Sequence, residues 1–155
     1  MRVGEIMTKN VHTVHLDDTL YHVWKVFQKV TFHHMIVTHG KILKGVVSDR
    51  DVLKRLSPKL GTKDEAIQDR ENLGMRISEI MTKKVVAVKK DISVNSATLL
   101  MIHKGVSCLP IATDDGVLEG IVTIRGMLKY YVEYCKKHDD DEQRKKIENE
   151  LDGLM

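Results

Sequence analysis

Few aromatic residues, few cysteines and no long apolar run characterise this sequence, and each shortage excludes a class of protein. Aromatic residues make up 5% of the 155 residues, which argues against a base-stacking surface for single-stranded nucleic acid. A net charge of +3 is too weak to indicate nucleic-acid binding, although it suits an anionic small ligand. No stretch approaches the roughly 20 apolar residues of a membrane span, and no N-terminal signal is visible. We therefore expect a cytoplasmic protein without a membrane segment.

The two cysteines and eight histidines give little sign of a metal site or a catalytic centre. Cys108 lies in an apolar stretch and Cys135 in a charged one, so we expect two free thiols in a reducing compartment. No Cys-x-x-Cys, His-x-x-x-His, Gly-x-Gly-x-x-Gly or Walker sequence occurs. Because a pair of nucleophile and base is also missing, the sequence predicts no metal, no required cofactor and no enzyme.

What the sequence does contain is an internal repeat. Glu-Ile-Met-Thr occurs at residues 5–8 and again at 79–82, and Gly-Val-Val-Ser at 45–48 is matched by Gly-Ile-Val-Thr at 120–123. A repeat of this length indicates one supersecondary unit that is used twice. Two such units related by a pseudo-two-fold axis form clefts between them, and clefts bind ligands.

Each repeat is predicted to run strand, helix, strand, strand, helix, because short apolar runs alternate with apolar residues at helical spacing. The predicted strands cover residues 11–14, 35–37, 42–47, 85–88, 109–113 and 117–123. The predicted helices cover residues 20–30, 50–56, 94–102 and 124–137, with a polar helical stretch at 63–72.

These elements divide the chain into four parts. The first repeat takes residues 1–56, a linker takes 57–76, the second repeat takes 77–137, and a charged helical tail takes 138–155. The tail places Ile147, Leu151 and Leu154 on one face of a helix. It is either a frayed terminal helix or a helix that packs on a second subunit.

Taken together, these segments resemble a tandem pair of CBS domains, the cystathionine-β-synthase-type module also called a Bateman module. Each repeat opens with Ile-Met-Thr and closes with Gly-hydrophobic-hydrophobic-Ser/Thr before a helix. Residues 105–111 match the family's Gly-hydrophobic-Ser-x-hydrophobic-Pro-hydrophobic segment. The likeness covers about residues 3–56 and 77–130. It implies an α/β fold of the α+β type, in which two pseudo-symmetric βαββα repeats pack sheet to sheet. It also implies a homodimer.

The segment at residues 48–51 carries the most informative chemistry. A carboxylate such as that of Asp51 can accept two hydrogen bonds from the diol of a ribose. Ser48 adds a hydroxyl group, and the guanidinium of Arg50 suits a phosphate. The pair Ser48 and Asp51 also matches a helix capping box. Both roles can coexist at one helix terminus.

The resemblance implies that each cleft takes its acid from one repeat and its opening strand from the other. For the competent cleft it implies Val46, Ser48, Arg50, Asp51, Thr82, Ala87, Val106 and Ser107 as ligand-binding residues. The second repeat has Gly126 where the first has its acid, so a weaker or altered second cleft is expected. That cleft would use Thr8, Thr13, Phe32, His33, Ile121 and Thr123. His33 and His34 either meet phosphates near the axis between the clefts or are ordinary surface histidines.

On these grounds we expect a non-catalytic regulatory module. It would bind an adenine nucleotide (AMP, ADP or ATP) between the repeats and signal to an effector protein in trans. One alternative is an oligomerisation scaffold with vestigial clefts, which Gly126 favours and Asp51 opposes. Another is a sensor of a different adenosyl ligand, such as S-adenosylmethionine.

Overall fold

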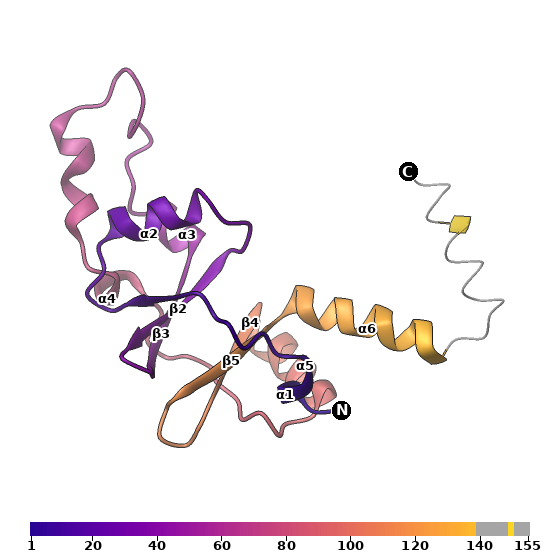
Figure 1. Cartoon of the computed structure of the whole chain (residues 1–155). Coiled ribbons are helices and arrows are strands. Elements are labelled where there is room, and N and C mark those ends of the chain that lie inside the picture. The colour runs from indigo at the N-terminus through magenta and orange to yellow at the C-terminus, as the bar shows by residue number, and fades with distance from the viewer. Residues whose placement is uncertain (139–148, 151–155) are drawn as a thin grey trace.

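Two small β-sheets, one from each half of the sequence, form the centre of the structure (Figure 1). The computed structural model describes residues 1–138 and 149–150 of the chain. The strands are β1 (Thr13–His15), β2 (His34–His39), β3 (Ile42–Ser48), β4 (Cys108–Ala112) and β5 (Leu118–Thr123). The helices are α1 (Val3–Ile6), α2 (Leu20–Phe27), α3 (Asp49–Leu53), the 3-10 helix η1 (Ile67–Gly74), α4 (Ile77–Ile80), α5 (Val94–Lys104) and α6 (Ile124–His138).

The order of these elements confirms the predicted fold class. In the first repeat β1 pairs with β2 in parallel, and β2 pairs with β3 antiparallel. In the second repeat β4 and β5 form the matching antiparallel pair. The two hairpins meet where Ile42 and Val117 form an antiparallel bridge, and the Leu118 N–H donates to the Lys41 carbonyl at 3.0 Å. Backbone hydrogen bonds therefore link the tips of the two hairpins.

The first strand of the second repeat, predicted at residues 85–88, is reduced to a single bridge. Val88 pairs in parallel with Ile111, its N–H donates to the Pro110 carbonyl at 3.0 Å, and its own carbonyl accepts from the Ala112 N–H at 3.0 Å. Extending this ladder back toward Val85 would need an N–H from Pro110, which proline lacks. The equivalent strand of the first repeat, β1, pairs over three residues and continues to His15.

Each repeat contributes its first helix to the hydrophobic core of the other repeat. Val3 of α1 is completely buried in the core of the second repeat, among residues such as Leu109 and Ile111. Ile77 of α4 is completely buried in the core of the first repeat, beside Leu20. The two halves of the sequence therefore do not coincide with the two cores, and neither core is complete without the other half.

The repeated Ile-Met-Thr segment packs against a glycine in the last strand of the opposite repeat. Thr82 and Val46 form an antiparallel bridge, and Thr8 forms the equivalent bridge with Ile121. A Cβ atom on Gly45 would lie 2.6 Å from the Met81 sulfur and 2.9 Å from the Thr82 carbonyl oxygen. A Cβ atom on Gly120 meets the same obstacle, at 2.6 Å from the sulfur of the matching methionine and 3.0 Å from the Thr8 carbonyl oxygen. The Ile-Met-Thr segment of one repeat and the Gly-hydrophobic-hydrophobic-Ser/Thr segment of the other thus form the two sides of one close contact.

The linker folds back over the helices of the first repeat. The polar helical stretch predicted at 63–72 corresponds to η1, which packs against α2. The Leu20 N–H donates to the Met75 carbonyl at 2.8 Å, and the Asn72 side chain donates to the Arg55 carbonyl at 2.8 Å. The linker thereby covers part of the outer face of α2.

Helix α6 extends away from the rest of the molecule (Figure 1). The amphipathic tail helix predicted from Ile147, Leu151 and Leu154 falls on positions outside the described residues. Among residues 1–138 and 149–150, no helix combines the length and the apolar character that crossing a membrane requires.

Candidate functional site

A cavity of about 310 Å³ lies between the two repeats. It receives residues from β3 and α3 on one side, and from the chain after α4 and the start of β4 on the other. Of the residues predicted for the competent cleft, the cavity is lined by Val46, Ser48, Arg50, Asp51, Thr82, Val106 and Ser107. Segments from both halves of the sequence thus meet in one place.

One predicted residue, Ala87, is exposed and does not line this cavity. Lys84, Val85 and Val86 line it in its place, directly after the bridge that Thr82 makes with β3. The extended chain passes the cavity before it reaches Ala87. Aligning the two repeats by sequence does not reveal this, because the strand expected at 85–88 is shortened to the bridge at Val88.

The capping box at the start of α3 is complete. The Ser48 hydroxyl accepts the Asp51 N–H at 3.1 Å, and the Asp51 carboxylate accepts the Ser48 N–H at 2.9 Å and the Ser48 hydroxyl at 2.7 Å. These last two bonds both end on Oδ2 of the carboxylate. The cap therefore holds the carboxylate at the wall of the cavity and leaves Oδ1 available to a second partner.

Two further residues, His34 and Cys108, also line the cavity. The sequence left His34 open between a place near phosphates and the surface, and it gave Cys108 no place in the cleft. Nε2 of His34 lies 3.2 Å from the Ser107 hydroxyl oxygen, which joins the first repeat to the second. The pattern along β2 could have identified His34, because neighbouring side chains of a strand point to opposite faces. His33 points the other way, and its Nδ1 lies 2.7 Å from Oδ2 of Asp49 at the surface.

The thiol of Cys108 does not suit nucleophilic chemistry. Burial raises the pKa of the Cys108 thiol to about 11, so the thiol stays protonated at neutral pH. Both Cys108 and Cys135 are free cysteines, as the sequence predicts. Cys108 therefore contributes a small, neutral wall to the cavity.

The residues predicted for the second cleft are arranged less favourably. Thr8 and Ile121 meet through their backbone bridge, and the Thr123 hydroxyl accepts the Gly126 N–H at 3.1 Å to cap α6. No carboxylate completes that cap, because the acid position is Gly126. The centroids of the Phe32 and His12 rings are 5.1 Å apart, His33 is paired with Asp49, and Thr13 is exposed at the start of β1.

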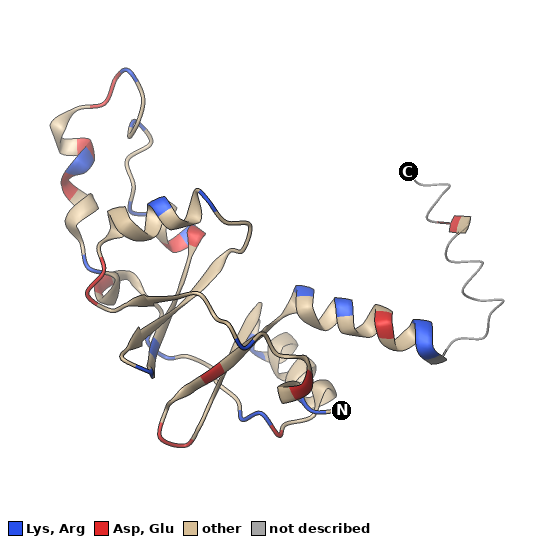
Figure 2. Ribbon diagram, viewed as in Figure 1, with Lys and Arg blue, Asp and Glu red and all other residues tan. Residues whose placement is uncertain are grey.

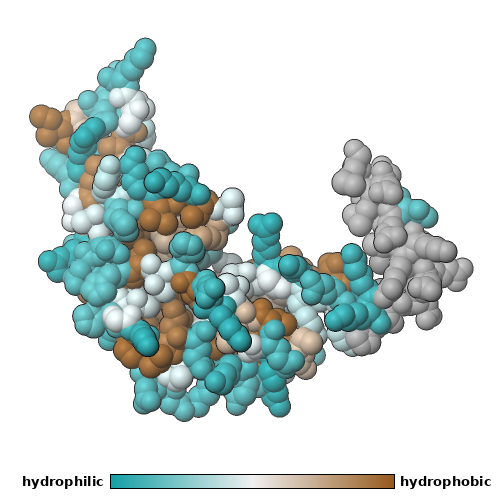
Figure 3. Space-filling view, in the orientation of Figure 1, coloured by the Kyte–Doolittle hydropathy of each residue, from teal (hydrophilic) through white to brown (hydrophobic). Residues whose placement is uncertain are grey.

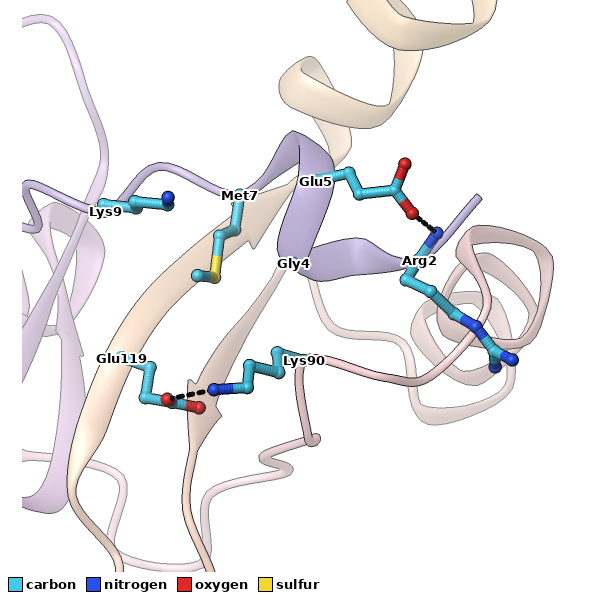
Figure 4. Close-up of a pocket in the computed structure, with 7 residues that line it drawn as sticks. All are labelled: Arg2, Gly4, Glu5, Met7, Lys9, Lys90 and Glu119. Atoms are coloured by element: carbon cyan, nitrogen blue, oxygen red, sulfur yellow. Dashed lines mark hydrogen bonds and ion pairs between the residues drawn. The ribbon is translucent and has the colours of Figure 1, made fainter.

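A separate cavity of about 550 Å³ lies beside α1 (Figure 4). Its polar groups bind one another: Nζ of Lys90 donates to Glu119 at 2.9 Å, and the Arg2 N–H donates to Glu5 at 2.8 Å. The remaining lining residues are Gly4, Met7 and Lys9. With its acid groups already paired, this cavity offers less specific chemistry than the one between the repeats.

Comparison with known proteins agrees with this architecture. The family model described as CBS domain matches the chain twice, at residues 3–58 and 77–133. An inosine-5'-monophosphate dehydrogenase of Methanocaldococcus jannaschii is 28% identical over 99% of this chain, which spans 31% of the length of that enzyme. An uncharacterized protein of Methanopyrus kandleri is 30% identical over 96% of this chain and 71% of its own length.

Solved structures share the fold. CBSX2 in complex with AMP superposes with a TM-score of 0.72 at 23% identity, covering 86% of this chain and 97% of its own. A CBS domain pair in complex with 5'-methylthioadenosine and S-adenosyl-L-methionine gives a TM-score of 0.69 at 22% identity, over 86% and 98% of the two chains. The cytosolic domain of the Mg²⁺ channel MgtE, in complex with ATP, gives 0.66 at 26% identity, over 83% of this chain and 48% of the other. With two family matches on one chain and this shared fold, the chain belongs to the CBS-domain family as a tandem pair of CBS domains.

Proposed function

We propose that the cavity between the repeats binds an adenine nucleotide (AMP, ADP or ATP) and that the protein is a non-catalytic regulatory module acting on an effector protein in trans. The observation that carries this proposal is the convergence of an oriented carboxylate, two cationic side chains and apolar walls in one cavity. Asp51 would accept the ribose hydroxyls, and Val46 and Val106 would enclose the base. CBS pairs of the same fold have been solved with AMP, with ATP and with S-adenosyl-L-methionine.

Calorimetric titration with AMP, ADP and ATP tests the proposal. We expect a Kd below about 100 μM for at least one of them, and a loss of more than about tenfold in Asp51→Ala, or about 1.4 kcal/mol. Asp114→Ala is the matched control, because Asp114 is exposed in a turn where it pairs with Lys89, away from the cavity. Titrations with S-adenosylmethionine and 5'-methylthioadenosine belong in the same series. If none of these compounds binds, the clefts are vestigial and the protein is a scaffold.

We also propose that two copies pair through the second repeat. A groove of about 740 Å³ runs between α5 and α6 and is lined mostly by apolar side chains. Leu99, Ile102, Leu128 and Tyr131 line it and are 60–73% exposed. Hydrophobic surface is visible along α6 in Figure 3, between the charged residues that Figure 2 shows on the same helix. The matching face of the first repeat is partly covered by the linker, so the α5–α6 face is the more open of the two to a second copy.

The groove and the cavity share Gly105, Val106 and Ser107. A ligand that repositions these residues would therefore change the surface presented to the second copy, which is a physical route from binding to signalling. Sedimentation equilibrium of Leu128→Glu tests the pairing, and the expected result is a shift from dimer to monomer. Leu53→Glu is the control, since Leu53 is 63% exposed at the equivalent position of α3. A monomeric wild-type protein, or a dimer that Leu128→Glu leaves intact, would contradict the proposed interface.

A further inference from the structure

His34 occupies a position in the cavity that neither repeat motif assigns. It begins β2, lies opposite Ser48 in the register of β2 and β3, and lines the cavity. Its Nε2 is 3.2 Å from the hydroxyl oxygen of Ser107, at the start of β4 in the other repeat. The imidazole thus stands where the two repeats meet, in the wall of the cavity.

The charges around His34 come from several elements. Among the neighbouring acids, Asp49 does most to raise the pKa of His34. Its Oδ2 also lies 2.7 Å from Nδ1 of the exposed His33 imidazole. Asp51 is held by the cap of α3. The titratable and charged groups that face or line this region are His33, Asp49, Arg50, Asp51, Lys84 and Cys108. Burial lowers the pKa of His34 and outweighs the opposing effect of the Asp49 carboxylate, so His34 is neutral at neutral pH.

Resting on the proposed function, we infer that the cavity selects adenosine ligands that carry phosphate and that His34 takes up a proton when the phosphate enters. Two cationic side chains, Arg50 and Lys84, line the cavity. The one carboxylate that lines it, that of Asp51, is already engaged in the cap of α3. A phosphate placed beside the imidazole stabilises the imidazolium. A sulfonium ligand such as S-adenosylmethionine would bring a further positive charge to the same wall, and adenosine would bring none.

The sign of the pH dependence is set by this arrangement. In the free protein burial lowers the pKa of His34, and the side chain is neutral at any pH above that pKa. A bound phosphate raises the pKa. Phosphate affinity therefore increases as the pH falls through the pKa of the bound state, and levels off below the pKa of the free state. A rise of one unit in the pKa corresponds to about tenfold in affinity at the low-pH limit.

Calorimetry with AMP and with adenosine, between about pH 8 and about pH 6, tests the inference. We expect AMP to bind wild type at least about tenfold more tightly than adenosine, and the preference to grow about fivefold toward low pH. His34→Gln should lose that growth, so that its preference for AMP over adenosine changes with pH only as the phosphate of AMP itself titrates. Because the phosphate of AMP titrates with a pKa of about 6, the His34→Gln series also supplies the correction for the ligand itself. His22→Gln is the control, since His22 is an exposed histidine on α2.

The outcomes separate this inference from the proposal beneath it. Equal affinity for AMP and adenosine, or an unchanged pH profile in a folded His34→Gln, overturns the inference and leaves the proposed function standing. If AMP and adenosine both fail to bind at every pH, the proposed function falls and takes the inference with it. Proton uptake, measured from the binding enthalpy in buffers of different ionisation enthalpy, should be larger for wild type with AMP than for His34→Gln, and the difference between them is the proton taken up by His34.

Discussion

The two CBS repeats begin their last helices in the same way but with different chemistry. In the first repeat Ser48 and Asp51 form a reciprocal cap, whereas in the second Thr123 caps alone because Gly126 has no side chain. Helix α6 nevertheless forms and runs for 15 residues. The Thr123 hydroxyl alone therefore caps α6, whereas in α3 the carboxylate of Asp51 accepts two further hydrogen bonds from Ser48. Only the first repeat thus places a carboxylate at the start of its last helix, where it lines the cavity.

The outer faces of the two repeats differ as well. Helix α3 has 5 residues, and Pro58 lies shortly after its end, so the chain leaves the helix and returns as a linker over α2. The sequence after α6 contains no proline, and α6 is a longer helix beside the apolar groove. The first repeat therefore presents a partly covered face and the second repeat a more open one, because the chain continues differently beyond the last strand of each repeat.

The largest effect is expected from breaking the exchange of first helices. Ile77→Ala removes a completely buried side chain from the core of the first repeat and should lower the free energy of unfolding by about 2–5 kcal/mol. Because each core depends on the other half, urea unfolding should remain a single transition in this variant. Ile67→Ala is the control at a 91% exposed position and should change stability by less than about 0.5 kcal/mol. Two separated transitions would show that the cores are independent.

A smaller and symmetric effect is expected at the two glycines beneath the repeated methionines. Gly45→Ala and Gly120→Ala each place a Cβ within 2.6 Å of a methionine sulfur and about 3 Å from a backbone oxygen. Each should lower stability by about 1–3 kcal/mol in a denaturation experiment. Gly74→Ala is the matched control, because a Cβ there has nothing within 4 Å. A cost at one of the two glycines alone would mean that the repeats do not pack equivalently.

The smallest effect is expected from restoring the missing acid. Gly126→Asp rebuilds the capping box of α6 next to Thr123, and a Cβ at this position is 3.5 Å from the Thr123 hydroxyl oxygen. The variant should gain about 1 kcal/mol of stability from the cap. Gly126→Ala separates this gain from the loss of glycine flexibility in a helix. Thermal unfolding measures both variants, and a Gly126→Asp protein no more stable than Gly126→Ala would contradict a capping role for the acid.

Local patterns predicted much of the site. The Ser48–Asp51 cap is evident from spacing, because a capping box involves only residues three apart. The shortened strand at 85–88 is predictable in principle from Pro110, but only once the partner of that strand is known. The position of Ala87 depends on that same strand, and His34 enters the cavity because its strand faces the other repeat. Both depend on contacts between residues far apart in the sequence.

By itself, the sequence determined that one unit is used twice, where α2, α5 and α6 begin, and that one of two equivalent positions carries an acid. These properties are local, since they rest on periodicity, capping and the identity of single residues. Only the tertiary structure decided that Val3 completes the second core and Ile77 the first, and that Lys84, Val85 and Val86 line the cavity in place of Ala87. The hydrophobic effect is non-directional, so the apolar residues of a short helix such as α1 do not reveal from the sequence which core they join. The packing of the folded chain decides that.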